Sequence, residues 1–418
     1  MSKKLLILIV GSILILGGVG VFIYYKSVNT QGGTNTTTNI FKSFLPFGLG
    51  NNQTSTQTGD SNTNVFGSEN NGTIDSDGVI IKDILKQVTT YGVTGANSFM
   101  IMKNATPGDS NTNPKNTPAI KFVEKSNGHI HQIFLDDGQS SEIDTSSIPN
   151  IYEAVFSGAG ESVVYRYLDD TGKNIQSFLN IIGGVNGQYL PENIISISSS
   201  PSNSIFYYIT KDENNNAVGN LFTTAGNKNV KVFKSAFSEW NTDWPTAENV
   251  YLTTKPSYNV GGYAYSLNTR SGIFTKILGN IKGLTTKTNQ DGSKMIYSTS
   301  ANIGPSLSVY NIQNNETKEL DLYSFADKCV FAFNKIDAYC GVPNTKPGTE
   351  NPDLWYQGLE SYSDSIYKID TNTGSISLIM NTNAKGGIDT TNLFLDKTEE
   401  YLFFINKKDS TLWSLNLK

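Results

Sequence analysis

The sequence predicts an all-β protein, a β-propeller of about seven four-stranded blades, and two observations support this fold class. Residues 283–320 read as four short apolar strands separated by turns rich in Asn, Asp and Gly. One antiparallel sheet of this kind cannot bury both of its faces, so copies of it must pack together. Similar units recur at intervals of about 42–45 residues, within the range of propeller blades. We count seven blades, with six or eight as alternatives.

The composition agrees with this class and limits the functions to consider. Only 17% of the residues are charged, while Tyr and Phe number 21 each, a balance that favours strands and polar turns. The net charge of −5 provides no basic surface for nucleic acid. Two histidines and two cysteines leave little material for a metal centre. We therefore expect no cofactor and no nucleic-acid partner.

The N-terminal segment predicts a single membrane anchor. Leu5–Tyr25 carries no charge, and its 21 residues would span roughly 31 Å as a helix, close to the thickness of a bilayer core. Lys3 and Lys4 favour a cytoplasmic stub, residues 1–4, so the chain after Lys26 is expected outside the membrane. The alternative is a cleaved signal peptide, although the apolar run is long and lacks a small-x-small cleavage site.

Residues 26–77 predict a disordered linker between the anchor and the propeller. They are rich in Asn, Thr, Gly and Ser and hold too few apolar residues to form a core. The apolar island Phe41–Gly50 is either a docking or membrane-surface motif or a chance apolar patch. Asp75–Gly78 resembles part of a calcium loop but lacks the other ligand positions, so a plain turn is the simpler interpretation. The propeller is expected over residues 78–418.

Each blade is recognised by its second strand, an apolar and aromatic run that follows a turn. These runs are Phe99–Met102, Val163–Tyr167, Ile205–Ile209, Val250–Leu252, Met295–Tyr297, Ala338–Cys340 and Tyr401–Ile405. The first and last intervals are about 20 residues longer than the others. We assign the extra residues to two insertions, Thr106–Pro118 in blade 1 and Val342–Ser363 in blade 6, both between second and third strands. Tight third-to-fourth hairpins are expected at 125–128, 268–272, 311–316 and 370–374.

The two ends of the propeller are predicted to close the ring together. The chain ends at Leu412–Leu417, which is only the third strand of blade 7. Val79–Leu85 is an apolar run placed before the first blade, and it could supply the missing outer strand. Such closure would remove an exposed sheet edge. The alternative is that Val79–Leu85 forms a short lead-in helix.

One turn carries a resemblance to a known repeat. Asn289–Lys294, followed by Met295-Ile296-Tyr297, resembles the TolB-type and WD40-like propeller repeat, although the histidine and Trp-Asp elements of strict WD40 repeats are missing. The likeness extends over residues 79–418 but is specific only in blade 5. It suggests a membrane-anchored, extracytoplasmic propeller of the uncharacterised bacterial kind. The TolB-type resemblance implies a non-catalytic, protein-binding scaffold, whereas the fold alone implies no function.

The two cysteines are expected to form a disulfide. A two-residue turn at Asn334-Lys335 would place Cys329 directly opposite Cys340 on paired strands. The expected compartment outside the membrane permits oxidation. The alternative is a pair of buried free thiols. A redox-active role is not expected, because the spacing is not Cys-x-x-Cys.

Few residues suggest catalysis or metal binding. His129 and His131 would share one face of a strand and could chelate a metal, but a solvated pair is the simpler interpretation and we expect no metal site. No serine elbow lies beside them, and no phosphate-binding loop is present. A glycoside hydrolase or lyase would need paired carboxylates. The conceivable ones are Glu153, Asp243, Asp291 and Asp337, most of them in or near turns.

Aromatic residues near the blade 6 insertion are the candidate binding site. Loops between second and third strands emerge on the same face as loops between blades, so both insertions are expected to crown one face. Aromatic and polar side chains there suit sugar or protein recognition. The alternative is that the tryptophans of blade 4 wedge between blades and the insertion folds back as a cap. The residues concerned are Trp355, Tyr356, Tyr362 and Asp364 in blade 6, and Trp240 and Trp244 in blade 4.

These observations together predict a non-catalytic, membrane-anchored module that binds a protein or glycan of the cell envelope. The alternative is an envelope enzyme of the propeller fold that acts on glycans.

Overall fold

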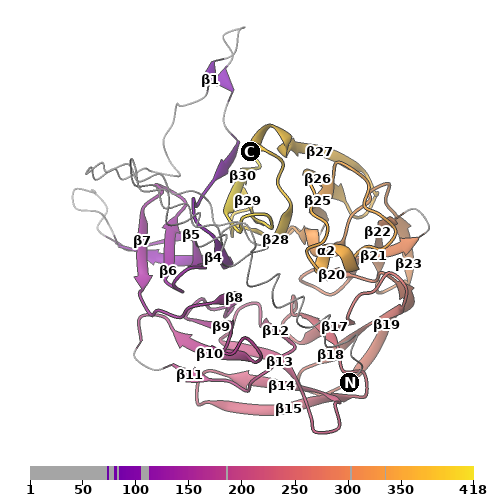
Figure 1. The fold of residues 1–418 in the computed structure, drawn as a ribbon. Helices are drawn as coiled ribbons and strands as arrows, with labels where there is room; N and C mark the ends of the chain where they lie inside the picture. Colours follow the sequence, from indigo (N-terminus) through magenta and orange to yellow (C-terminus); the bar gives the residue numbers. More distant parts are fainter. Residues whose placement is uncertain are drawn as a thin grey trace, which may run out of the picture. The chain divides into compact units, whose positions relative to one another are not determined.

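The computed structural model describes residues 84–104, 113–184, 187–301, 304–334 and 336–418, together with residues 73–74 and 80–81. The described strands form seven four-stranded antiparallel sheets that follow one another around a ring (Figure 1). The predicted all-β propeller with seven blades is therefore confirmed. No helix within these described ranges is long and apolar enough to cross a membrane.

Several predictions for the N-terminal part fall outside the described residues. They are the anchor Leu5–Tyr25, the island Phe41–Gly50 and the turn Asp75–Gly78. Within the predicted linker and just after it, β1 (Thr73–Ile74) pairs antiparallel with β2 (Ile80–Ile81).

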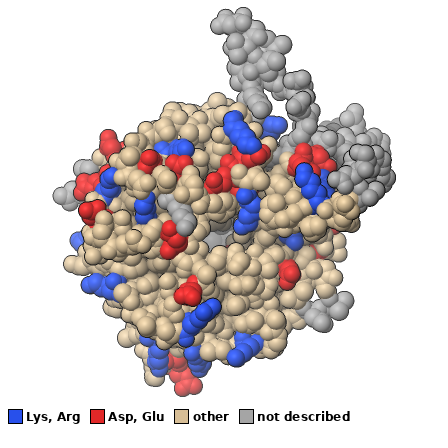
Figure 2. All heavy atoms as spheres, turned by 180° about the vertical axis from the view of Figure 1, so that it is seen from behind, with Lys and Arg blue, Asp and Glu red and all other residues tan. Residues whose placement is uncertain are grey.

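The strands of each blade run from the innermost to the outermost in chain order, except in blade 7. Blades 1 to 3 consist of β4 (Val93–Lys103), β5 (Lys115–Glu124), β6 (Ile130–Phe134), β7 (Ser140–Asp144); β8 (Ile151–Phe156), β9 (Ser162–Leu168), β10 (Ile175–Ile181), β11 (Gln188–Tyr189); and β12 (Ser196–Ser199), β13 (Ile205–Lys211), β14 (Ala217–Thr223), β15 (Lys228–Ser235). Blades 4 and 5 consist of β16 (Trp240–Asp243), β17 (Asn249–Thr254), β18 (Gly261–Asn268), β19 (Phe274–Lys282); and β20 (Thr286–Thr288), β21 (Lys294–Ala301), β22 (Gly304–Asn311), β23 (Glu316–Glu319). Blades 6 and 7 consist of β24 (Cys329–Phe331), β25 (Asp337–Pro343), β26 (Asp364–Asp370), β27 (Ile376–Asn381); and β28 (Thr390–Leu395), β29 (Tyr401–Asn406), β30 (Leu412–Asn416), β3 (Leu85–Gln87). In the described part of the chain, three short helices join these strands: η2 (Ala326–Lys328), α2 (Asp353–Tyr356) and η3 (Thr382–Lys385). Seen from behind, the molecule shows acidic and basic side chains interspersed over its surface (Figure 2).

Blade 5 shows why polar turns define the repeat. Between β20 and β21, the Asn289 side-chain oxygen accepts the Lys294 N–H at 3.0 Å, and the Asp291 carboxylate accepts the Ser293 N–H at 2.9 Å. Gly292 adopts a φ of 71°, in the left-handed region. A Cβ on Gly292 would also lie 2.3 Å from the Tyr251 hydroxyl of blade 4. The turn residues therefore fix both the hairpin and its contact with the neighbouring blade.

The prediction for blade 1 was wrong by one strand. Phe99–Met102 lies in β4, the first strand, and not in the second. The Gly95-Ala96-Asn97 segment before it is part of the same strand and not a turn. Gly95 is needed there because β4 approaches blade 2 closely: a Cβ on Gly95 would lie 2.0 Å from the Ala154 carbonyl oxygen. The insertion thus joins first and second strands, and the hairpin at 125–128 joins second and third. Consequently β4 ends and β5 begins on the face opposite to the one where β25 ends and the blade 6 insertion begins.

The ring closes between the two ends of the propeller, as predicted, but through a different segment. β3 pairs with β30, with Leu85 opposite Leu415 and Gln87 opposite Trp413. The closing strand begins at Leu85, whereas Ile80–Ile81 belongs to the separate hairpin with β1. The Leu85 side chain is 2% exposed and packs in the core between blades 6 and 7. The alternative of a lead-in helix is therefore excluded for the described residues of this segment.

The hydrophobic cores lie between neighbouring blades. The core between blades 3 and 4 contains Trp240, which is 1% exposed and donates its indole N–H to the Phe237 carbonyl at 2.7 Å. Trp244 is buried in the same core. These tryptophans wedge between blades, which confirms the alternative stated from the sequence, and Trp240 is not a surface binding residue. Its large apolar ring is stabilised by burial among aromatic neighbours.

Cys329 and Cys340 form a disulfide within blade 6. They lie directly opposite each other on β24 and β25, the register that the sequence predicts. The connecting loop is longer than the predicted two-residue turn. The hydrogen bond that closes it, from the Ala332 N–H to the Asp337 carbonyl at 2.9 Å, leaves four residues, 333–336, in the loop. A four-residue loop and a two-residue turn with the same centre give the same pairing, so the disulfide prediction survives this error.

Candidate functional site

A cavity of about 370 Å³ lies where the inner strands of blades 4 to 7 face one another. Its volume falls within the range of small-ligand pockets, about 300–1,000 Å³. The blade 6 insertion joins β25 to β26, as predicted, and contains α2 (Figure 1). Trp355 and Tyr356 of α2 line the cavity. The lining residues are largely polar: Asn241, Thr242, Asp243, Thr253, Thr285, Thr286, Lys287, Asp327, Cys329, Trp355, Tyr356, Thr391, Asn392, Leu393 and Lys407.

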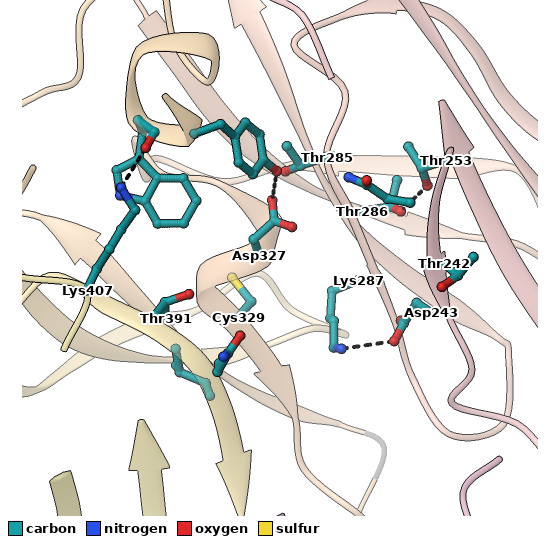
Figure 3. Close-up of a pocket in the computed structure, with 15 residues that line it drawn as sticks. Thr242, Asp243, Thr253, Thr285, Thr286, Lys287, Asp327, Cys329, Thr391 and Lys407 are labelled. Atoms are coloured by element: carbon teal, nitrogen blue, oxygen red, sulfur yellow. Dashed lines mark hydrogen bonds and ion pairs between the residues drawn. The ribbon is translucent and has the colours of Figure 1, made fainter. Parts of the chain in front are cut away.

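An ion pair between two blades forms one wall of the cavity. Asp243 on β16 and Lys287 on β20 each follow a threonine in the innermost strand of their blade. The Lys287 Nζ lies 3.0 Å from Asp243 Oδ1 (Figure 3). The Asp243 carboxylate raises the pKa of Lys287, against the opposing effect of burial. A third of the Lys287 side chain stays exposed, so the pair is held by protein yet remains in contact with the solvent of the cavity.

A hydrogen bond connects the insertion to the inner wall. The Tyr356 hydroxyl on α2 donates to Asp327 Oδ2 at 2.6 Å (Figure 3). Burial raises the pKa of Asp327, although the hydrogen bond from Tyr356 acts in the opposite direction. Burial and the adjacent Asp327 together hold the pKa of Tyr356 well above its ordinary value. The phenol is thus the proton donor of this pair, and it fixes the orientation of the Tyr356 ring beside the cavity.

A buried group of three charged residues lies beneath the insertion. The Lys328 Nζ is 2.7 Å from Asp364 Oδ2 and 2.6 Å from Asp389 Oδ1, and all three side chains are fully buried. They meet because Lys328 directly precedes β24, Asp364 begins β26 and Asp389 directly precedes β28. All three positions belong to the face from which the insertion emerges.

Asp389 anchors the insertion to this group. Its carboxylate accepts the Trp355 indole N–H at 3.1 Å and the Tyr362 backbone N–H at 3.0 Å. The Trp355 ring stacks on Phe325, with ring centroids 5.2 Å apart. The Lys407 Nζ donates to the Trp355 carbonyl at 2.6 Å. The insertion therefore folds back onto the propeller as a cap.

The two carboxylates of this group differ in their environment. Burial raises the pKa of Asp364, and the Lys328 ammonium only partly offsets this effect. Asp364 Oδ1 is also buried without a hydrogen-bond partner. For Asp389, burial likewise acts to raise the pKa, but Lys328 and the N–H donors of Tyr362 and Trp355 outweigh it, so the pKa lies below its ordinary value. Both oxygens of the Asp389 carboxylate thus accept hydrogen bonds, whereas only Oδ2 of Asp364 does.

The predicted aromatic crown does not form. Trp355 and Tyr362 are 3% and 7% exposed, and Asp364 is fully buried, so these three residues hold the cap instead of contacting a partner. Trp355 and Tyr356 both line the cavity, but only Tyr356, which is 41% exposed, also presents a large accessible surface. The crown does not form because two of its residues have buried partners far away in the sequence. The Trp355 indole binds Asp389, and the Asp364 carboxylate binds Lys328.

The other candidates do not form a catalytic or metal site. His129 contacts Glu142, and His131 lies 3.4 Å from Glu124. No group of three potential metal ligands occurs among the residues that the structure describes. Of the four conceivable carboxylates, only Asp243 lines the cavity. The other three have local partners: Glu153 contacts Arg166, Asp291 stabilises the blade 5 turn, and Asp337 lies 2.9 Å from Lys368.

Most of the cavity was not predicted from the sequence. Lys287, Asp327, Thr391 and Lys407 belong to regular parts of the repeat, where nothing in the local pattern distinguishes them from other polar residues. One signal was present: a threonine precedes a charged residue in the innermost strands of two successive blades, Thr242-Asp243 and Thr286-Lys287.

Comparison with known proteins gives the fold but no family. No family model matches the chain, and no curated protein sequence matches it. Among solved structures, it is similar to the β-propeller domain of the Trilobed protease from Pyrococcus furiosus, with 12% identity, a TM-score of 0.51, and coverage of 73% of this chain and 93% of that one. At this identity the likeness shows the propeller fold alone.

Two further solved structures have lower TM-scores. TolB from Acinetobacter baumannii shows 10% identity and a TM-score of 0.42, with 77% of this chain and 80% of that chain covered. An oligogalacturonate lyase in complex with manganese shows 8% identity and a TM-score of 0.48, with 78% and 98% covered.

Proposed function

We propose that this protein is a non-catalytic binding module and that the cavity between blades 4 and 7 receives a polar ligand. One observation carries the proposal: the cavity is polar, and its acidic side chains already have partners. Asp243 is paired with Lys287, and Asp327 accepts the Tyr356 hydroxyl. Such walls offer hydrogen bonds to a ligand but no free general base or activated nucleophile.

We further propose that the module is attached to a membrane and works outside it, on a protein or glycan of the cell envelope. The uncharged run Leu5–Tyr25, flanked by Lys3 and Lys4, supports the anchor. The disulfide between Cys329 and Cys340 supports an oxidising compartment. Mass spectrometry of the mature N-terminus tests the anchor: we expect an intact start, and a start near residue 27 would show cleavage instead.

A second candidate function, a glycoside hydrolase or lyase, rests on the two carboxylates of the cavity. Burial raises the pKa of Asp327, as a general acid requires, while Asp243 forms an ion pair with Lys287. Two carboxyl groups with different environments are the usual arrangement for acid and base in glycoside hydrolysis. The binding proposal is preferred because both groups are already occupied by neighbouring side chains.

One experiment separates the two candidates. The immobilised full chain is incubated with envelope glycans and proteins, and retained and released molecules are identified by mass spectrometry. We expect retention without chemical change, weakened by Thr391→Val, which removes one cavity hydroxyl and keeps the β-branched shape. The control is Thr373→Val in the β26–β27 hairpin, away from the cavity. Chemical conversion of a glycan by the unaltered chain, abolished in Asp327→Asn, would favour the glycoside hydrolase or lyase over the binding module.

A further inference from the structure

We infer that the ligand of the cavity is a neutral saccharide of one or two sugar units. This inference rests on the proposed binding function and specifies the chemistry of the ligand. Three features of the cavity support it: the balance of its charges, the type of its hydrogen-bonding groups, and a bulge in one of its strands.

The charged groups of the cavity favour a neutral ligand. Two lysines and two aspartates line it, and each has a partner within the protein. Lys287 is paired with Asp243, Asp327 accepts the Tyr356 hydroxyl, and Lys407 donates to a backbone carbonyl. Because the two lysines and two aspartates balance in charge, the cavity offers a charged ligand no net electrostatic attraction. A neutral ligand leaves all three contacts in place.

The uncharged groups suit a ligand with many hydroxyls. Threonine side chains reach the cavity from three blades, Thr242 from blade 4, Thr286 from blade 5 and Thr391 from blade 7 (Figure 3). Asn241 and Asn392 add two amides. Threonine hydroxyls and asparagine amides can both donate and accept hydrogen bonds, as the hydroxyls of a sugar can. The Thr242 and Thr286 hydroxyls already bond Ser196 and Thr253, at 2.9 and 2.6 Å, and each keeps acceptor capacity for the hydroxyls of a ligand.

Tyr356 provides the apolar surface that a sugar ring also needs. Its ring is 41% exposed, and its hydroxyl is held by Asp327. An aromatic side chain fixed in this way offers a flat face to the C–H groups of a ligand at little cost in conformational entropy.

The innermost strand of blade 7 carries a bulge at the cavity wall, and the innermost strands of blades 1 and 2 carry bulges that do not reach the cavity. The pairing of β28 with β29 passes from Thr391 opposite Ile405 to Phe394 opposite Phe403, so one extra residue is accommodated in β28. Asn392 lies in this bulge with a φ of 51°, is exposed, and lines the cavity. Bulges redirect side chains and occur often beside functional sites. The bulge thus places in the cavity a side-chain amide that has no hydrogen-bond partner among the described residues. This amide is available to a ligand.

The test measures binding of defined probes to the full chain, purified in a detergent without a sugar headgroup. The probes are immobilised neutral mono- and disaccharides, their carboxylated and sulfated counterparts, and extended peptides. We expect retention of at least one neutral saccharide, weakened about three- to tenfold by Asn392→Gly, which removes the amide and keeps the backbone conformation. The matched control is Asn215→Gly, an exposed asparagine with a φ of 63° that does not line the cavity. It should bind as the unaltered chain does.

The outcomes separate this inference from the function on which it rests. Retention of a charged saccharide or a peptide, weakened by Asn392→Gly, would overturn the neutral saccharide and leave the binding site in place. Retention of a neutral saccharide that Asn392→Gly does not affect would place the ligand elsewhere and overturn the inference. Retention of no probe in any class would contradict both statements.

Discussion

The buried group formed by Lys328, Asp364 and Asp389 gives the strongest prediction about stability. Replacing Lys328 with Met keeps much of the side-chain volume but leaves two buried carboxylates without their ammonium. All three side chains are fully buried and the contacts are 2.6 and 2.7 Å, so solvent cannot take the place of the lost charge. Removing one partner of such a buried pair destabilises a protein by about 3–5 kcal/mol.

This cost can be measured as a change in melting temperature. With an unfolding entropy of about 2.1 cal/mol/K per residue, a propeller of roughly 330 residues has an entropy of about 0.7 kcal/mol/K. The expected decrease for Lys328→Met is therefore about 4–7 °C at pH 7, followed by circular dichroism or calorimetry of the full chain. The control Lys228→Met, at an exposed position of β15, should change the free energy of unfolding by less than about 0.5 kcal/mol. A melting temperature that Lys328→Met leaves unchanged, or raises, would refute the assigned role of this group.

Three further predictions concern the stability of the propeller. The pKa of Asp364 is raised, so the stability that Asp364→Asn loses relative to the unaltered chain should shrink as the pH rises from 4 to 7. The pKa of Asp389 is lowered, so the stability lost in Asp389→Asn should persist over the same range. Melting curves of both variants between pH 4 and 7 check these two trends. Leu85→Ala should reduce the free energy of unfolding by about 2–5 kcal/mol in chemical denaturation, since Leu85 is buried in the closing strand; a loss below about 1 kcal/mol would argue against closure by β3. Replacing both Cys329 and Cys340 with Ala should lower the free energy of unfolding by about 3 kcal/mol in the same assay. The reason is that the disulfide, with a sequence separation of 11, restricts the entropy of the unfolded chain. An unchanged denaturation midpoint would contradict this prediction.

The sequence predicted the fold well where local chemistry determines the structure. In blade 5 the turn between β20 and β21 is stabilised by side chains within five residues of one another, such as Asn289 with Lys294. The disulfide was predicted for a related reason. Pairing within a hairpin depends only on where its centre lies, so Cys329 and Cys340 meet although the loop is longer than expected.

Prediction failed where a distant partner determines the role of a residue. Gly95 looks like part of a turn, but it is the contact with Ala154 of the next blade that requires a glycine inside β4. Trp355 looks like a surface aromatic, yet its indole binds Asp389, which is 34 residues away. The cavity combines residues from four blades, and no local pattern shows that Thr242 and Thr391 line the same space.

Binding to the cavity between blades 4 and 7 is the central claim, and comparison of the full chain with Thr391→Val tests it most directly. Both proteins are exposed to the same mixture of envelope-derived glycans, and the retained amount of each glycan is quantified together with any cleavage product. We predict that Thr391→Val retains at least threefold less, at an unchanged melting temperature, and that neither protein releases a product, since one ligand hydrogen bond is lost and no chemistry occurs. Equal retention by the two proteins, or product formation, would contradict the claim.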